Sequence, residues 1–222
     1  MSIQNNPPTP FPEVNAILRE LLEGVQGILG SHLVGMYLEG SLTTPDFDRD
    51  SDIDFVVVTD EAISEDLFSV LKVMHERIAQ IDSWWAIQLE GSYLSRQALR
   101  RHDPAHALHP NIERGAGERL KWIVHNETWN IHRYILRERG IPMSGPDPKT
   151  LIDPVSPDAL RRAMFIAIHG LAPRILQDPS TIAGWGIPVV YRAVAVPHPV
   201  YAPVWRYYLK SQGRQVVPGS IG

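Results

Sequence analysis

Two aspartates and an earlier Gly-Ser pair have the residue types and spacing of a phosphate-handling site. Gly40 and Ser41 end an apolar run, and ten residues later Asp52 and Asp54 open a second run. Alternate residues of a strand point to the same face, so the two carboxylates should project together. Paired carboxylates suit Mg²⁺, which usually also binds substrate phosphates. Gly40 permits close backbone approach, and Ser41 can hold phosphate oxygens, so the pattern predicts a Mg²⁺-nucleoside triphosphate site.

Two-metal phosphoryl chemistry needs a third acid, which completes the ligand set or accepts the proton of the attacking hydroxyl. Glu90 is the preferred candidate because it lies on the polar face of the next predicted strand, and Gly91 leaves room beside it. Asp60 and Glu61 are weaker candidates, since they lie at the far end of the aspartate strand. The alternative for each acid is a solvated side chain at a strand end. We expect Glu90 to help deprotonate an acceptor hydroxyl that attacks the α-phosphate and releases pyrophosphate.

The surrounding pattern predicts the elements that position these residues. Apolar residues at helical spacing predict helices over residues 14–29 and 65–81, the second beginning at Ser64. Apolar runs predict strands over residues 33–38, 53–58 and 84–93. In the last of these, Trp85, Ile87 and Leu89 should lie opposite the face that carries Glu90. The order helix, strand, strand, helix, strand predicts an α+β core with a small mixed sheet.

The second half of the chain is predicted to be mainly helical. Residues 95–117 are rich in histidine, proline and glycine and are expected to form a loop. Helical spacing resumes over residues 118–139 and ends at Gly140. A turn over residues 145–148 precedes another helix that starts at Ser156-Pro157. A boundary near residues 105–117 would therefore separate a first domain, 13–105, from a helical acceptor-binding domain, 117–222.

Composition narrows the functional classes. The chain has 222 residues, 44% of them hydrophobic, with 21 basic and 25 acidic side chains and a net charge of −4. This balance argues against a nucleic-acid partner and favours a small acceptor. Cysteine is absent, so neither disulfides nor thiolate chemistry is available. With no signal-peptide pattern and no apolar run long enough to cross a membrane, a cytoplasmic protein is expected. The oligomeric state is not indicated.

The Gly-Ser pair, the spacer and the Asp-Ile-Asp strand resemble the signature of the DNA polymerase β-type nucleotidyltransferases. A second match, in residues 134–140, 145–146 and 151–155, resembles the aminoglycoside adenylyltransferases that modify streptomycin and spectinomycin and so confer antibiotic resistance. This resemblance implies ATP and Mg²⁺ bound between a nucleotidyltransferase domain and a helical domain, with Glu90 as the base. The family binds its drug through acids and an aromatic residue. Trp122 and Trp129 are candidates for that aromatic residue, with core packing as the alternative for each.

The chain departs from this family after about residue 190. Pro197, Pro199 and Pro203 are three prolines within seven residues, where the family continues a helix. Prolines at this density would break a helix. We hypothesise a frameshift near codon 196, which would leave the helical domain incomplete.

Three other interpretations stay open. His102, His106 and His109, with His125 and His132 further on, raise the question of a zinc site. The expected spacing of seven places His125 and His132 on one helix face, whereas helical ligands are typically four apart, so hydrogen-bonding or surface histidines are preferred. The acceptor could instead be a protein hydroxyl, as in nucleotidyltransferase antitoxins that transfer AMP to a partner toxin. The altered C-terminal sequence also allows a non-catalytic ATP-binding protein.

Overall fold

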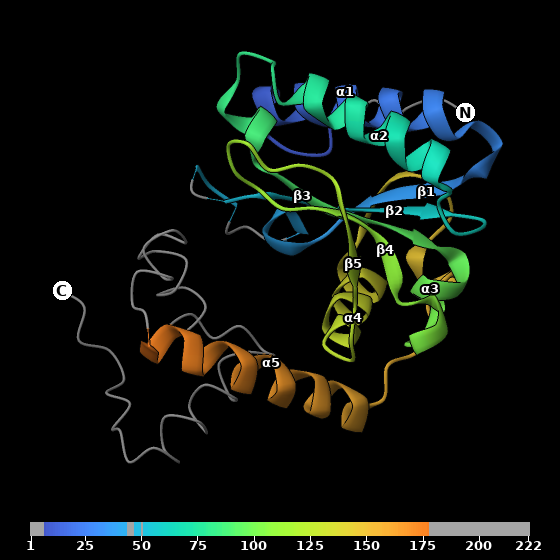
Figure 1. The fold of residues 1–222 in the computed structure, drawn as a ribbon, viewed down its shortest axis with the longest axis vertical. Helices are drawn as coiled ribbons and strands as arrows, with labels where there is room; N and C mark the ends of the chain where they lie inside the picture. The colour runs from blue at the N-terminus through green and yellow to red at the C-terminus, as the bar shows by residue number, and fades with distance from the viewer. Residues whose placement is uncertain (1–6, 44–46, 50, 178–222) are drawn as a thin grey trace. The chain divides into compact units, whose positions relative to one another are not determined.

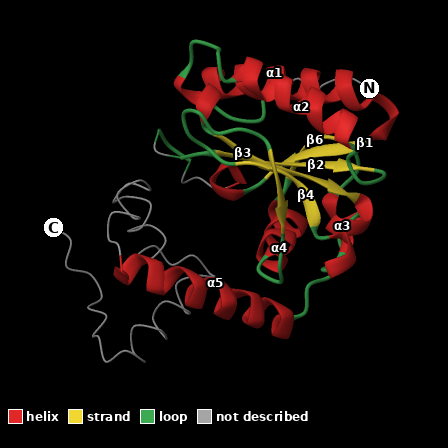
Figure 2. Ribbon diagram, in the orientation of Figure 1, coloured by secondary structure: helices red, strands yellow, loops and turns green. Residues whose placement is uncertain are grey.

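A six-stranded mixed sheet organises the chain (Figures 1 and 2). The computed structural model describes residues 7–43, 47–49 and 51–177. The strands, in the order β5-β4-β3-β2-β1-β6 across the sheet, are β1 (Leu33–Leu38), β2 (Ile53–Thr59), β3 (Leu89–Ser95), β4 (Leu108–Ile112), β5 (Lys121–Val124) and β6 (Ile141–Ser144). β2 and β3 are parallel, and the other neighbouring strands described here are antiparallel.

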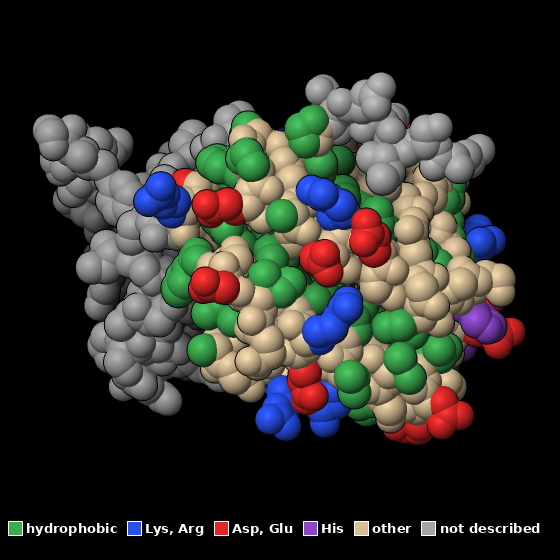
Figure 3. Space-filling view, turned by 90° about the horizontal axis from the view of Figure 1, so that it is seen from above, with side chains coloured by type: hydrophobic (Ala, Val, Ile, Leu, Met, Phe, Trp, Pro, Cys, Tyr) green, Lys and Arg blue, Asp and Glu red, His purple; other side chains and the backbone are tan. Residues whose placement is uncertain are grey.

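Helices cover both faces of this sheet. The helices of the described chain are α1 (Pro12–Leu29), α2 (Glu65–Ile78), α3 (Arg96–Arg100), α4 (Trp129–Arg139) and α5 (Pro157–Gln177). α1 and α2 lie on one face, and α4 lies on the other (Figure 1). On the outer side of α1 and α2, acidic and basic side chains are interspersed among apolar ones (Figure 3). The predicted α+β class is confirmed.

Strand alternation divides the buried side chains between two hydrophobic clusters. Ile53 and Phe55 pack with α1 and α2. Val56 and Val58 point the other way and pack with Trp129 of α4. Because side chains alternate along a strand, Asp54 lies on the same face as Val56 and Val58. The polar residues near the start of β2 are therefore directed to the α4 side of the sheet.

The first two strands and the first two helices agree with the sequence prediction. β1 has the predicted bounds, β2 is one residue longer than predicted, and α1 contains the predicted apolar stripe. Ser64 caps α2, its Oγ accepting a hydrogen bond of 3.3 Å from the Leu67 N–H. The helix that starts at Pro157 and the helix end at Gly140 also agree. These elements have strong local signals, because apolar period and capping residue coincide.

The predicted third strand over residues 84–93 is wrong in its first half. Trp84–Ile87 forms a 3₁₀ turn, and β3 begins only at Leu89. Ser83 explains the difference, since its Oγ accepts a hydrogen bond of 3.3 Å from the Trp85 N–H and starts the turn. Trp85 is buried and stacks on Phe47 at 5.4 Å between ring centroids. The apolar run over residues 84–93 is thus divided between a 3₁₀ turn and β3.

The loop predicted over residues 95–117 is also wrong in part. Ser95 caps α3 by accepting from the Ala98 N–H at 3.1 Å, and Asp103 caps a 3₁₀ turn, Pro104–His106. The strand β4 follows and includes Pro110. A proline lacks only its own N–H, so a short strand tolerates it where that donor is not needed.

The helix predicted over residues 118–139 is two elements instead. Lys121–Val124 forms β5 and pairs with β4, and α4 begins only at Trp129. β-Branched residues Ile123 and Val124 favour the strand. His125 precedes α4, so the expectation that His125 and His132 share one helix face is wrong.

The chain divides into two compact units, residues 1–160 and 161–222. The sheet lies in the first unit and extends through β4 and β5 across the boundary expected near residues 105–117. The proline-rich stretch after residue 190 and the hypothesised frameshift lie outside the described residues. Among the helices that are described, none has the length and apolar character needed to cross a membrane.

Candidate active site

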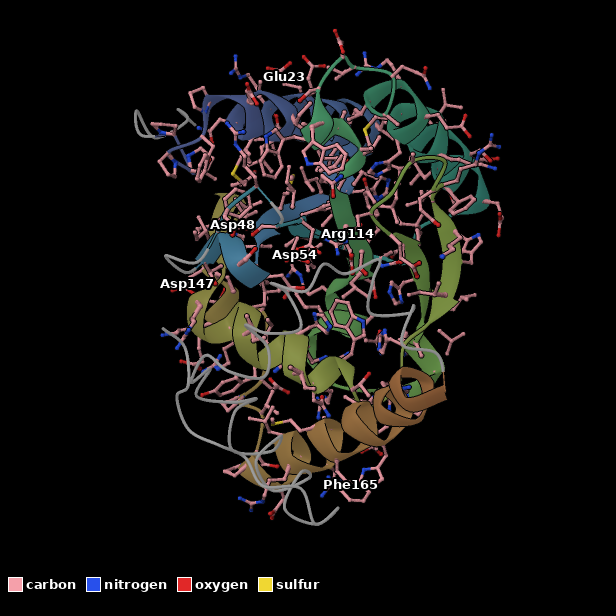
Figure 4. All side chains as sticks on the ribbon, turned by 90° about the vertical axis from the view of Figure 1, so that its left-hand side faces the viewer. Glu23, Asp48, Asp54, Arg114, Asp147 and Phe165 are labelled. Atoms are coloured by element: carbon pink, nitrogen blue, oxygen red, sulfur yellow. The ribbon has the colours of Figure 1, made fainter. Side chains whose placement is uncertain are left out.

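Four carboxylates meet where β2 and β3 begin and β1 ends; we call Glu39, Asp52, Asp54 and Glu90 the carboxylate cluster. Asp54 and Glu90 are direct partners in the parallel β2–β3 register. Glu39 follows β1, and its backbone N–H donates to the Asp54 carbonyl at 3.1 Å. Figure 4 labels Asp54 in the middle of the molecule, below α1 and α2. Three strands that are adjacent in the sheet therefore bring these acids together.

Asp52 stands just before β2 and joins the cluster through Asp54 and Arg114. Burial raises the pKa of Asp54, and the neighbouring Asp52 raises it further. The Arg114 Nη1 lies 3.5 Å from the Asp52 Oδ2, and Figure 4 labels Arg114 and Asp54. The preceding loop is closed by Ser51, whose Oγ donates to Asp48 Oδ1 at 2.9 Å. Arg114, which the sequence prediction missed, places a cation at the rim of the cluster.

Gly40 is required by the geometry of this site. Its φ is +61°, and a Cβ at this position would collide with Asp54 Oδ2. Only glycine combines this backbone conformation with so close an approach. Ser41 follows within a 3₁₀ turn, Gly40–Thr43, and the Thr43 hydroxyl donates to the Gly40 carbonyl at 2.8 Å. The turn therefore places the Gly40–Ser41 backbone directly beside the carboxylates.

Burial and mutual repulsion shift the acidity of the cluster. Burial, with the charges of Asp52, Glu39 and Glu90, holds the pKa of Asp54 well above its ordinary value. Burial and the Asp52 charge likewise raise the pKa of Glu90 from 4.5 to about 7, although Arg114 and His132 act in the opposite direction. Carboxylates packed this closely are unfavourable unless a cation lies near them. The cluster is therefore suited to binding a positive ion.

The donor set fits Mg²⁺. In the described part of the chain, no three Asp, Glu or His side chains form a preassembled metal-binding group. Mg²⁺ does not need one, because it usually takes one or two carboxylates and completes its octahedron with water and substrate phosphates. Asp52 and Asp54 supply hard oxygen ligands beside a backbone turn that can approach phosphates. The arrangement suits an ion that arrives with a triphosphate.

Glu39 and His132 form a pair that sequence analysis did not anticipate. The His132 Nδ1 lies 3.0 Å from Glu39 Oε1, and Trp129 packs against the imidazole with ring centroids 4.9 Å apart. Burial lowers the pKa of His132, but the charge and hydrogen bond of Glu39 and the charge of Glu90 outweigh this, so the pKa is raised. The pair introduces a second basic group at the carboxylate cluster. Glu39 was detectable as the residue before Gly40, whereas its partner lies 93 positions away.

The other site candidates occupy different surroundings. Asp60 is exposed at the far end of β2 and contacts His32 Nδ1 at 3.1 Å, and Glu61 follows it. Gly91 was expected to leave room beside Glu90. Instead, the space at Gly91 is filled by Phe55 on the face of the sheet that α1 and α2 cover. Trp122 stacks on Phe68 with centroids 4.9 Å apart. These contacts belong to packing or to the surface.

Besides His132, three of the questioned histidines form hydrogen bonds in the interior or at the surface. His109 and His125 are buried, with their Nδ1 atoms 3.3 Å apart, and we call these two with Arg133 the imidazole cluster. Arg133 Nη2 lies 3.1 Å from His125 Nε2. His106 contacts Asp103 at 2.9 Å on the surface. A guanidinium in contact with an imidazole nitrogen disfavours a metal there, because both would compete for one lone pair.

Comparisons with known proteins give a family match for part of the chain and a similar fold. Residues 18–102 match the nucleotidyltransferase domain family. The fold is similar to a spectinomycin adenyltransferase, AAD(9), from Enterococcus faecialis, solved with ATP and spectinomycin. That match has a TM-score of 0.57 and 17% identity and covers 72% of this chain and 68% of the other. No curated protein sequence gives a significant match.

A weaker likeness is to a toxin–antitoxin structure with AMP-PNP. It has a TM-score of 0.34 and 14% identity and covers 78% of this chain and 99% of the other. A mutant toxin–antitoxin, MntA-HpeT, gives 0.33 and 12% over 76% and 98% of the two chains. The matched family residues include the Gly40–Ser41 turn, Asp52 and Asp54.

Proposed function

We propose that this chain, whose residues 18–102 match the nucleotidyltransferase domain family, transfers AMP from ATP to a hydroxyl of a small acceptor. We propose an aminoglycoside such as streptomycin or spectinomycin as the acceptor, with pyrophosphate as the second product. The observation that carries this proposal is the register of β2 and β3, which places Asp54 beside Glu90. Asp52 and the Gly40 turn complete the arrangement.

Each residue has a proposed role that follows from its position. Asp52, Asp54 and Glu90 would hold Mg²⁺, which neutralises charge on the triphosphate and the departing pyrophosphate when bound. Gly40 and Ser41 bind outer phosphate oxygens through backbone N–H groups and the serine hydroxyl. Glu90, beside Asp54 in the β2–β3 register, accepts the proton of the acceptor hydroxyl. The acceptor oxygen then bonds to the α-phosphorus, and the bond from that phosphorus to the pyrophosphate oxygen breaks.

The proposed acceptor class is an aminoglycoside. It is supported by the fold similarity to AAD(9) and by the match of residues 134–155 to aminoglycoside adenylyltransferases. A net charge of −4 suits a cationic drug. A role in antibiotic resistance would follow from this acceptor.

Pyrophosphate release tests the proposal. The purified protein is incubated with Mg²⁺, ATP and, in turn, streptomycin, spectinomycin and other aminoglycosides. Drug-dependent release that Asp54→Asn and Glu90→Gln abolish, and the exposed control Asp60→Asn retains, would support the proposal. Release without any drug, together with AMP attached to a co-purified protein, would favour a protein acceptor. A folded protein that binds ATP and releases no pyrophosphate with any acceptor would contradict the catalytic assignment.

A further inference from the structure

His132 occupies a position from which one imidazole nitrogen can reach a ligand. Its Nδ1 is engaged by Glu39 Oε1 at 3.0 Å, and Trp129 packs on its ring. The His132 side chain is 50% exposed, whereas the Glu39 side chain is only 8% exposed. Within the described residues no hydrogen bond of His132 Nε2 is found. The imidazole is thus fixed at one end by a buried carboxylate and open at the other.

The backbone of Glu39 is held in place by β2. Glu39 directly precedes Gly40, and its backbone N–H donates to the Asp54 carbonyl at 3.1 Å. Its second oxygen, Oε2, is buried and has no hydrogen-bond partner among the described residues. Among the described residues, the cation that contacts this carboxylate is the His132 imidazole, which offsets its charge when protonated. A carboxylate that fixes one nitrogen of a histidine also orients the other nitrogen.

The surrounding charges favour an imidazolium that binds an anion. Glu39 from the end of β1 and Glu90 from β3 attract the positive charge, while Arg133 of the same helix repels it, and the pKa of His132 is raised overall. His125, in the segment before α4, is also close enough for its pKa to be lowered by His132. The carboxylate cluster alone would repel a triphosphate. A fixed cation at its border reduces that repulsion and provides an N–H donor to a phosphate oxygen.

We infer that Glu39 and His132 form a triphosphate-binding element, in which His132 Nε2 donates to a non-bridging phosphate oxygen and Glu39 positions the imidazole. The inference rests on the proposed function and adds to it a binding residue from α4 and a positioning residue beside Gly40. It also gives α4 a part in nucleotide binding, although this helix lies beyond the matched family residues 18–102.

Calorimetric titration with Mg²⁺ and α,β-methylene-ATP, a non-reacting triphosphate, tests the inference directly. His132→Gln should weaken binding about tenfold or more, since a charge-assisted hydrogen bond is lost. His132→Arg keeps a cation beside Glu39 and should restore most of the affinity. Adenosine, which lacks phosphates, should bind each variant equally. His106→Gln is the matched control, because the Asp103–His106 pair has the same chemistry at 2.9 Å but lies on the surface.

A double-mutant cycle tests the positioning role of Glu39. Glu39→Gln should weaken the triphosphate, and adding it to His132→Gln should cause little further loss, because both changes remove one interaction. Thermal unfolding of every variant checks the fold. If wild type and His132→Gln bind the triphosphate equally well, the inference is overturned and the proposed function stays intact. Wild type that binds no triphosphate would overturn both.

Discussion

Two consecutive residues of α4 enter two polar clusters of opposite character. His132 reaches the carboxylate cluster, where like charges accumulate and Glu39 Oε2 lacks a partner among the described residues. Arg133 enters the imidazole cluster, where its guanidinium donates to the Leu99 carbonyl at 3.0 Å and the Ala98 carbonyl at 2.7 Å. The second cluster is internally satisfied and the first is not. A buried polar group without sufficient internal partners indicates a ligand, whereas a satisfied one indicates structure.

The largest expected effect is a loss of activity when an acid of the carboxylate cluster is replaced. Asp54→Asn should lower pyrophosphate release by about a thousandfold or more, because it removes a charged ligand for the metal–triphosphate. The unfolding temperature should stay equal or rise, since the pKa of Asp54 is raised and the folded state therefore disfavours its charge. Release assays and thermal unfolding of the same preparation measure both. Loss of activity with a fall in unfolding temperature would show that Asp54 supports the fold instead.

The next largest effect is a loss of stability when the arginine of the imidazole cluster is replaced. Arg133→Met should reduce the free energy of unfolding by about 3–5 kcal/mol, because it leaves two backbone carbonyls and His125 without their donor. Urea unfolding gives this number directly. Arg101→Met is the control. The Arg101 side chain is 70% exposed and forms a surface ion pair with Asp153 at 3.6 Å, so its loss should reduce the free energy of unfolding by about 1 kcal/mol or less. Similar losses in the two variants would contradict the distinction between the clusters.

Gly40 connects the fold to the carboxylate cluster. Gly40→Ala should cost about 1–3 kcal/mol of stability, because its φ is +61° and the added Cβ would displace Asp54. Binding of Mg²⁺ with α,β-methylene-ATP should weaken at the same time. Gly27→Ala provides the comparison, since a Cβ there meets nothing within 4 Å and α1 should gain up to about 1 kcal/mol. Unchanged nucleotide binding in Gly40→Ala would argue against a phosphate-binding turn.

Sequence analysis found those parts of the structure that depend on local signals. The Gly-Ser turn, Asp52, Asp54 and the first two strands follow from apolar runs and short-range spacing. β4 was missed because His109 and Pro110 are typical of loops, yet pairing with β5 and β3 stabilises the strand. The sequence predicts that Glu90 lies on the strand after the one that carries Asp54. It does not predict the register that makes the two residues direct partners.

The contacts of α4 could not be derived in this way. Glu39 and His132 are 93 positions apart, and Arg133 reaches backbone carbonyls 34 and 35 positions away. No local period encodes such pairs, because they depend on which face of α4 packs on the sheet. Once β5 was mistaken for the start of a helix, the phase of α4 was lost as well.

The two clusters should also respond oppositely to acid. The pKa of Glu90 is raised to about 7 by burial and Asp52, so its contribution to stability is complete below the ordinary 4.5 and is lost as the pH rises through 7. The pKa of His125 is lowered to about 3 by burial and Arg133, so its contribution is present above 6.5 and is lost as the pH falls toward 3. Between pH 7 and pH 5, acidification therefore relieves the carboxylate cluster and strains the imidazole cluster.

Replacing the titrating residue of one cluster at a time should separate the two pH dependences of stability. Glu90→Gln loses the gain on acidification, so its free energy of unfolding should fall more steeply than that of wild type between pH 7 and pH 5, by about 1 kcal/mol. His125→Gln keeps an acceptor for Arg133 without a titrating ring, so its stability should fall less than that of wild type over the same range. Urea unfolding at several pH values measures both slopes. Slopes that change in the same direction in the two variants would show that the clusters do not differ in the way their contacts indicate.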